Sequence, residues 1–357
     1  MNQLYIQVSQ RTAIAASQVK AVLQLFEAGA TVPFIARYRK EATGNLDEVA
    51  IAQIKETAKE VEELEKRRQF ILDTIKQQDK LTPDLEKSIR EANSMTLLED
   101  LYLPYKQKKK TRAQVARERG LQGLADFLLK QTAADPEHEA EKYFSDELGV
   151  SDHQAALQGA CDILSEQFSE DLQLRSVVRQ QFNRSGLLIS KVARGKKDQA
   201  EKYRDYIDWS EPLTKAPSHR ILAIFRGENE GLLSVKLEPN PEEVMEMLAR
   251  RVIKGRNRCA DYVTQALEDS YKRLLQPSIE TEFRQGLKER ADREAVRVFA
   301  ENVKQLLLES PLGQKNVLAI DPGFRTGCKV VCLNRQGDLL HNETIYPHSG
   351  HREALEA

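Results

Sequence analysis

The sequence predicts a mainly α fold: an elongated multi-helical scaffold with a small β-hairpin insertion and an incomplete α/β module at its C-terminus. Three observations predict it. Apolar residues recur at intervals of three and four through most of the first 190 residues, as on the buried faces of helices. Two apolar runs, Ser218–Glu228 and Gly231–Leu237, flank a glycine turn, which indicates a hairpin. Residues 316–346 alternate apolar runs with glycine turns, which indicates three short strands.

The first helices meet across a short turn. Ser17 is expected to cap a helix that ends at Gly29, and Pro33 suits the first turn of the next helix. Two helices at so tight a turn predict a helix-turn-helix-like element, although plain core packing explains the same pattern equally well. In the first case the second helix projects three basic side chains toward a nucleic acid, namely Arg37, Arg39 and Lys40.

Longer helices are expected to follow. Asp47 caps a helix whose apolar stripe continues to Ile75, which at ~1.5 Å per residue makes it roughly 45 Å long. Thr96 and Glu99 have the spacing of a capping box, so a short helix is expected to begin there and to stop at Pro104. The same periodicity predicts helices that begin at Thr82 and that cover 121–131, 137–147, 151–184 and 242–309, the last interrupted at Gln276–Pro277.

The segment around Asp321 places a carboxylate at the end of a strand. Val317–Ile320 is typical of a buried strand, and Asp321 follows it into a Pro-Gly turn, with further strands expected at Cys328–Leu333 and Leu339–Tyr346. Ribonuclease-H-like nucleases hold their first metal-binding aspartate in such a place, beside a small-residue turn that admits a phosphate. For an isolated Asp-Pro-Gly, a hairpin with a turn-capping aspartate is the better explanation. Asp321 is therefore only the candidate first carboxylate of such a site, and no catalytic residue is assigned.

Basic residues gather in three clusters, although the net charge of the chain is −1. The first cluster spans Lys106–Arg119, the second Lys191–Lys197 and the third Arg250–Arg258. A single charge run is usually a solvated face. Three dense clusters favour phosphate binding, because each can release counterions locally whatever the net charge. The candidate contact residues are Lys106, Lys108, Lys109, Lys110 and Arg112, then Lys196 and Lys197, then Arg250, Arg251, Lys254, Arg256 and Arg258.

Composition argues against several other classes of function. The four cysteines form no Cys-x-x-Cys pair, and nothing nearby completes a ligand set with His348 and His351, which suit a solvated loop. Neither a metal nor a cofactor is expected, and no small-molecule substrate. No apolar run is long enough to cross a membrane. The first residues lack the features of a signal peptide, which predicts a cytoplasmic protein.

Four ungapped blocks resemble a known family. They are Glu27–Glu41, Leu98–Lys106, Tyr271–Glu280 and Asp321–Lys329, and all four look like the bacterial Tex family of transcription accessory proteins. The resemblance implies a helical scaffold with a helix-turn-helix element and a YqgF-type ribonuclease-H-like domain. It further implies a helix-hairpin-helix region and a C-terminal OB-fold RNA-binding domain of the ribosomal S-one type. It also implies a degenerate catalytic set, and so a domain that binds rather than cuts.

This resemblance sets the expected domains and function. They are a Tex-like N-terminal helical region at 1–190, a central helical region at 191–315 with the hairpin near 218–237, and a truncated ribonuclease-H-like module at 316–357. The expected function is a non-enzymatic scaffold that contacts RNA or DNA phosphates and serves the transcription machinery. Two alternatives stay open: a metal-dependent nuclease or resolvase that uses Asp321, and a pure protein-interaction scaffold. The nuclease needs further carboxylates, whereas nucleic-acid binding needs the three clusters on one side of the fold.

Overall fold

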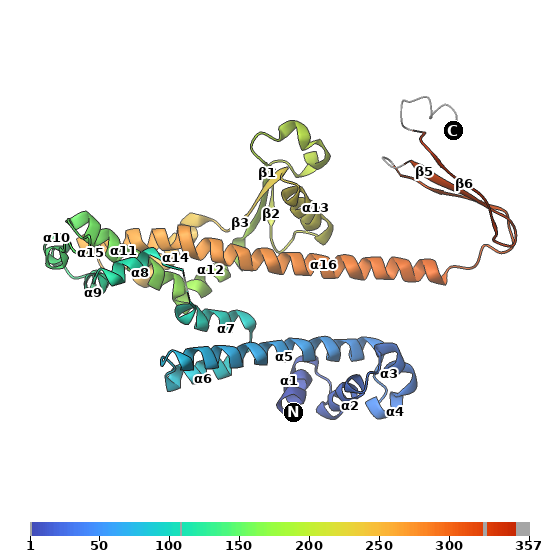
Figure 1. Ribbon diagram of the computed structural model, residues 1–357, viewed down its shortest axis with the longest axis horizontal. Coiled ribbons are helices and arrows are strands. Elements are labelled where there is room, and N and C mark those ends of the chain that lie inside the picture. The colour runs from blue at the N-terminus through green and yellow to red at the C-terminus, as the bar shows by residue number, and fades with distance from the viewer. Residues whose placement is uncertain (1, 108, 324–326, 348–357) are drawn as a thin grey trace. The chain divides into compact units, whose positions relative to one another are not determined.

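The computed structural model describes residues 2–107, 109–323 and 327–347, and the chain divides into two compact units. The first unit, Met1–Leu287, is helical apart from one three-stranded sheet. The second unit, Lys288–Ala357, contains the remainder of a long helix and a second three-stranded sheet (Figure 1). The mainly helical class predicted from apolar periodicity is confirmed.

The N-terminal core forms where three short helices, α1 (Asn2–Thr12), α2 (Ala16–Glu27) and α3 (Val32–Tyr38), pack on the first half of the long helix α5 (Glu48–Gln77). The short helix α4 (Lys40–Thr43) packs on α2 and α3. Asp47 caps α5 as predicted, since its side chain accepts a hydrogen bond from the Ala50 amide at 2.7 Å. Gly29 ends α2 with a positive φ of 83°, also as predicted. The prediction that Ser17 caps α2 is wrong, because the cap position is Ala15.

The second half of α5 packs on the next two helices, α6 (Pro83–Glu91) and α7 (Met95–Tyr102), and α7 runs into a 3₁₀ turn, η1 (Leu103–Tyr105). The predicted capping box at Thr96 is wrong by two residues. The Ser94 hydroxyl accepts from the Leu97 amide at 3.2 Å, so α7 begins earlier. Glu99 is instead paired with Arg67 at 2.5 Å, so its side chain joins α7 to α5.

A helical bundle follows, with α11 (His153–Glu170) against α8, α9 and α15. The prediction of one helix over 151–184 is wrong, because Asp171 accepts hydrogen bonds from the Gln173 and Leu174 amides and so caps a separate helix. The predicted helix 137–147 is also shorter than expected. The other helical elements of the bundle are α8 (Arg112–Glu118), α9 (Gln122–Lys130), α10 (Pro136–Ala140), η2 (Glu141–Tyr143), α12 (Leu172–Ser185), α14 (Pro241–Val252), α15 (Arg258–Ser270) and η5 (Tyr271–Leu275).

The first sheet corrects the predicted hairpin. Residues Ser218–Asn229 form a helix, α13, which packs on the sheet and buries Ile221, Ile224 and Phe225 at helical spacing. The strand predicted at 231–237 exists as β3, but its partner is the unpredicted β1. The strands are β1 (Leu187–Val192), β2 (Trp209–Pro212) and β3 (Leu233–Glu238), antiparallel in the order β2-β1-β3, with 3₁₀ turns η3 (Lys197–Gln199) and η4 (Glu201–Tyr206) between β1 and β2.

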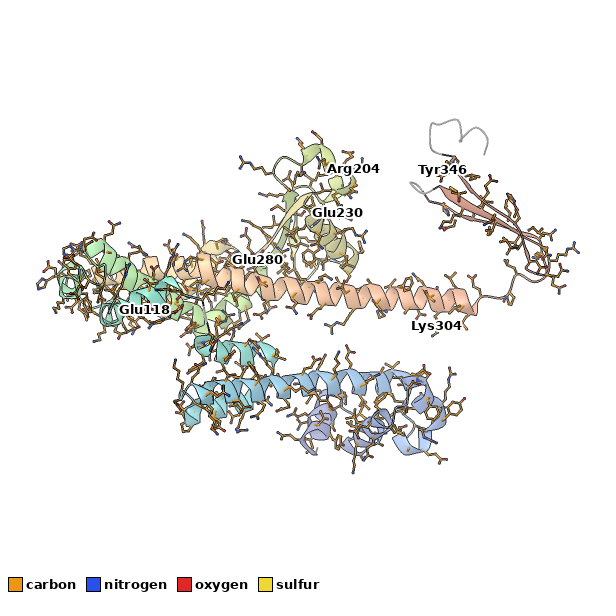
Figure 2. All side chains as sticks on the ribbon, viewed as in Figure 1. Glu118, Arg204, Glu230, Glu280, Lys304 and Tyr346 are labelled. Atoms are coloured by element: carbon orange, nitrogen blue, oxygen red, sulfur yellow. The ribbon has the colours of Figure 1, made fainter. Side chains whose placement is uncertain are left out.

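The long helix α16 (Gln276–Leu308) continues from α15 through a π-helical turn, η5. The interruption predicted at Gln276–Pro277 is therefore wrong. The π-helical turn accommodates Pro277, which cannot donate to a carbonyl of the preceding turn. The break lies instead at residues 253–257, between α14 and α15. Early in α16, Glu280 (labelled in Figure 2) accepts a hydrogen bond from the Leu237 amide at 3.0 Å and so covers the edge of β3.

The second sheet is the predicted meander. Its strands are β4 (Val317–Asp321), β5 (Cys328–Leu333) and β6 (Leu339–Ile345), antiparallel in chain order. The turn after β5 closes as expected, because the Asn334 amide donates to the Asp338 carbonyl at 3.1 Å and Gly337 has a positive φ of 89°. Apolar side chains remain uncovered: Leu318 is 64% exposed and Ile320 is 56% exposed.

Candidate nucleic-acid interface

The three basic residues predicted at the second helix stand at the end of α3. Ile35 and Ala36 are buried in the N-terminal core, whereas the side chains of Arg37, Arg39 and Lys40 are exposed to solvent. The Arg37 guanidinium lies 4.0 Å from the Glu48 carboxylate, while that of Arg39 lies over the Phe34 ring at 5.4 Å. Within the described residues, neither Arg39 nor Lys40 has a carboxylate partner. These three cations are therefore accessible to a ligand.

The first basic cluster begins in the loop after η1 and continues on α8, a helix that the sequence analysis missed. Thr111 caps this helix by accepting from the Gln114 amide at 3.0 Å, and Ala113 and Ala116 are its buried residues. The Lys110 ammonium lies 3.3 Å from the carboxylate of Glu118, a residue labelled in Figure 2. Lys106, Lys109 and Arg112 are exposed, whereas Lys108 lies outside the described residues.

The second basic cluster extends from the end of β1 to the start of η3. Gly195 has a positive φ of 75° and allows the turn, which leaves the cations around it exposed. The Lys196 ammonium donates to the Gln199 side chain at 3.2 Å. In the part of the chain that the structure describes, Lys191, Arg194 and Lys197 have no carboxylate partner.

The third basic cluster spans the loop between α14 and α15, which the buried side chain of Gln131 holds in place. This side chain donates to the Val252 carbonyl at 2.8 Å and accepts from the Lys254 amide at 2.7 Å. Two of the predicted residues are already paired, Arg250 with Glu246 at 2.5 Å and Arg258 with Asp135 and Glu137. The charge of Asp135, followed by that of Glu137, raises the pKa of Arg258. The residues left exposed without a carboxylate partner, among those described, are Arg251, Lys254 and Arg256.

The structure separates the clusters. Arg258 begins α15, whereas Asp269 near its other end is acted on by the charges of Arg273 and Arg112. The 13 residues of α15 therefore place the first and third clusters at its opposite ends, about 20 Å apart at ~1.5 Å per residue. The second cluster belongs to the first sheet. In the described part of the chain, the first and third clusters are thus neighbours of one helix, and the second lies where β1 leads into η3.

A buried charge network was not predicted. Asp100 of α7 is only 5% exposed and binds Arg175 at 2.6 Å and Arg179 at 2.5 Å, both on α12. Arg179 also binds Glu282 of α16 at 2.9 Å. Burial lowers the pKa of Arg179, but Asp100 and Glu282 together raise it above its ordinary value. One signal in the sequence could have indicated it. Asp100 stands in the otherwise largely apolar segment 97–103, where a buried carboxylate requires a cationic partner.

A cavity of about 230 Å³ lies beside this network. Arg112 and Arg273 line it together with the acids Asp162, Glu166 and Glu170. Burial raises the pKa of Asp162. Because both signs of charge line the cavity, it is not a pure anion site.

Asp321 lies exposed at the end of β4, opposite Lys329 in the strand register. Over the described ranges, no three His, Cys, Asp or Glu side chains are grouped so that they could hold a metal ion. His348 and His351 lie outside those ranges. A search of the described helices for one that is both long and apolar enough to cross a membrane finds none.

Comparisons with known proteins point to one family in three segments of the chain. Residues 2–76 match the Tex-like protein N-terminal domain, residues 131–299 the Tex central region-like model, and residues 315–357 the Tex protein YqgF-like domain.

Three curated relatives show the same similarity. The transcriptional accessory protein Tex of Neisseria gonorrhoeae is 40% identical over 347 residues, which are 96% of this chain and 46% of that protein. The protein tex of Bordetella pertussis is 41% identical over 352 residues, covering 95% of this chain and 44% of the relative. The human S1 RNA-binding domain-containing protein 1 is 31% identical over 367 residues, covering 98% of this chain and 36% of the relative. The chain spans about half the length of its bacterial relatives or less.

Proposed function

Since this chain belongs to the Tex family, we propose that it is the non-catalytic, nucleic-acid-binding part of a transcription accessory protein. One relative is named a transcriptional accessory protein and another an S1 RNA-binding domain-containing protein, which supports a role at RNA or DNA. In this role the helical bundle and the first sheet position the three basic clusters, and these clusters bind phosphates. The transcription machinery is the proposed partner, and the cytoplasm the proposed location.

The observation that carries the proposal is the set of exposed cations that no carboxylate neutralises. A cation paired with a carboxylate is already partly neutralised, so a phosphate that binds it has to displace that carboxylate. An unpaired exposed cation that neutralises a phosphate releases the counterions condensed on the nucleic acid. The proposed phosphate contacts within the described residues are therefore Arg39, Lys40, Lys106, Lys109, Lys191, Arg194, Lys196, Lys197, Arg251, Lys254 and Arg256. The paired residues Lys110, Arg250 and Arg258 are expected to contribute less.

This distinction can be tested through the salt dependence of binding. The triple variant Arg251→Gln, Lys254→Gln and Arg256→Gln should flatten the plot of log affinity against log salt by about two to three units, at ~0.7 to 0.9 per phosphate contact. Fluorescence anisotropy with a labelled oligonucleotide at several salt concentrations measures the slope.

A matched triple variant removes the same number of charges. Lys59, Lys142 and Lys272 are exposed lysines that each pair with a glutamate three or four residues away. Their replacement by Gln should change the slope by less than one unit. If both triple variants had the same slope as the wild type, the third cluster would not bind phosphates, and its charges would serve only to keep the protein soluble.

A further inference from the structure

We propose that the exposed aromatic pair on α3, Phe34 and Tyr38, is a stacking site for the bases of single-stranded nucleic acid. The inference rests on the proposed function, because it specifies which form of nucleic acid the first unit binds. Neither ring was among the residues that the sequence analysis assigned to a site. Both lie on the side of α3 that faces away from the N-terminal core, which buries Ile35.

The two rings form a platform open to solvent. Phe34 is 40% exposed and Tyr38 is 68% exposed, one helical turn apart. Their ring centroids lie 5.4 Å apart with an interplanar angle of 46°. The second ring therefore extends the apolar surface of the first without covering it. Aromatic surface of this size is favourable to bury, so a flat apolar partner gains free energy by covering it.

A hollow adjoins the platform. Its volume is about 440 Å³, and Phe34 and Arg39 form one wall, while the turn between α2 and α3 forms the other. Gly29 in this turn has a positive φ of 83°, and a Cβ at that position would meet no atom within 4 Å. The space over the turn is therefore open, and it lies within the range of volumes that hold small planar ligands. A base that leaves the strand has room beside the Phe34 ring.

The charges around the rings suit a polyanion. Arg39 lies 5.4 Å over the Phe34 ring, and Lys40 follows it directly. Among the described acids, Glu48 alone pairs with one of the three cations, Arg37, and at the long distance of 4.0 Å. Single-strand-binding proteins combine such aromatic rings with arginine and lysine, because every base has a π face and every nucleotide a phosphate. A protein partner with a neutral or basic surface would offer these cations no opposite charge, so a polyanion is the better fit.

The geometry favours a single strand over a duplex. The seven residues of α3 make it only about 10 Å long at ~1.5 Å per residue, and the chain turns at Arg39 into α4. A helix this short offers little length for base contacts along a major groove. Bases inside a duplex are already stacked on one another, so only unpaired bases can reach Phe34 and Tyr38.

The test uses the whole chain and a single-stranded oligonucleotide that contains the fluorescent base 2-aminopurine. Phe34→Ala and Tyr38→Ala should each weaken single-strand binding about 5- to 100-fold, which is the range for one lost stacking contact. The slope against salt should not change, because neither variant removes a cation. Quenching of 2-aminopurine on binding should be reduced in both variants. Tyr38→Phe keeps the ring and should bind as the wild type does.

Phe70 provides the matched control. It is 51% exposed on α5 and also lies beside an arginine, Arg67, but that arginine is paired with Glu99. Phe70→Ala should leave binding unchanged, and thermal melting checks that each variant is folded. If folded Phe34→Ala and Tyr38→Ala bound a single strand as tightly as the wild type, the stacking site would be overturned, but the proposed phosphate contacts would stand. The aromatic pair would then be assigned to a protein partner. Binding of neither single strands nor duplexes by the wild type would overturn the proposed function as well.

Discussion

The two three-stranded sheets of this chain have the same strand number and antiparallel pairing, but their surroundings differ. In the first sheet, Leu188 and Leu237 are fully buried and α13 packs on the sheet. The edge of β3 is also bonded, because the Arg284 guanidinium donates to the Val235 carbonyl at 2.9 Å. In the second sheet, Leu318 and Ile320 are more than half exposed. The difference teaches that a strand pattern predicts pairing, whereas stability depends on what covers the strands.

The largest expected effect is on local opening. Amides in β4 to β6 should exchange with solvent at least about a hundred times faster than amides in β1 and β3, because opening an uncovered sheet costs less free energy than unfolding the core. Hydrogen exchange followed by mass spectrometry measures this difference, with the central strands β1 and β5 as the matched pair. Comparable protection in the two sheets would show that the second sheet is covered in solution.

A smaller effect is expected from removing one apolar side chain in each sheet. Leu237→Ala should lower the free energy of unfolding by about 2–5 kcal/mol, because it leaves a cavity against fully packed neighbours. Ile320→Ala should lower it by less than ~1 kcal/mol, because the side chain is already 56% exposed. Urea denaturation measures both free energies of unfolding. Equal losses in the two variants would show that the Ile320 side chain is buried in solution.

The smallest expected effect is that of Asp321→Ala, at the exposed end of β4. Two-metal cleavage requires several carboxylates, and the described residues contain no group of three potential metal ligands at Asp321. Incubation with single-stranded, duplex and branched substrates in Mg²⁺ or Mn²⁺ should therefore give the same background with the wild type and the variant. Metal-dependent cleavage that disappears in Asp321→Ala would favour the nuclease alternative instead.

Most helices could be predicted because their signals are local. The cap at Asp47 and the left-handed turn at Gly29 depend on residues within one helical turn, and the structure has both. The error at 218–229 shows the limit of this reasoning. A short apolar run fits either a strand or a buried helix, and the spacing of Ile221, Ile224 and Phe225 favoured the helix that is observed.

The site residues show the same limit. Their number and their sign of charge are visible in the sequence, but their partners are distant along the chain. Arg258 is paired with Asp135, more than a hundred residues away, whereas Arg256 beside it has no carboxylate partner among the described residues. The exposure of Phe34 and Tyr38 was also hidden, because an apolar residue in a helix is normally assigned to the core.

The sequence by itself determined the family, the mainly helical class, the long helix α5 and the meander of β4 to β6, because blocks of identity, caps and periodicity are properties of neighbouring residues. Only the tertiary structure decided which strand pairs with β3, which cations are already neutralised, and which aromatic rings stay open to solvent. Each of these depends on the burial and distance of groups far apart in the chain. Coulomb interactions and apolar burial act through space, so no local pattern specifies them.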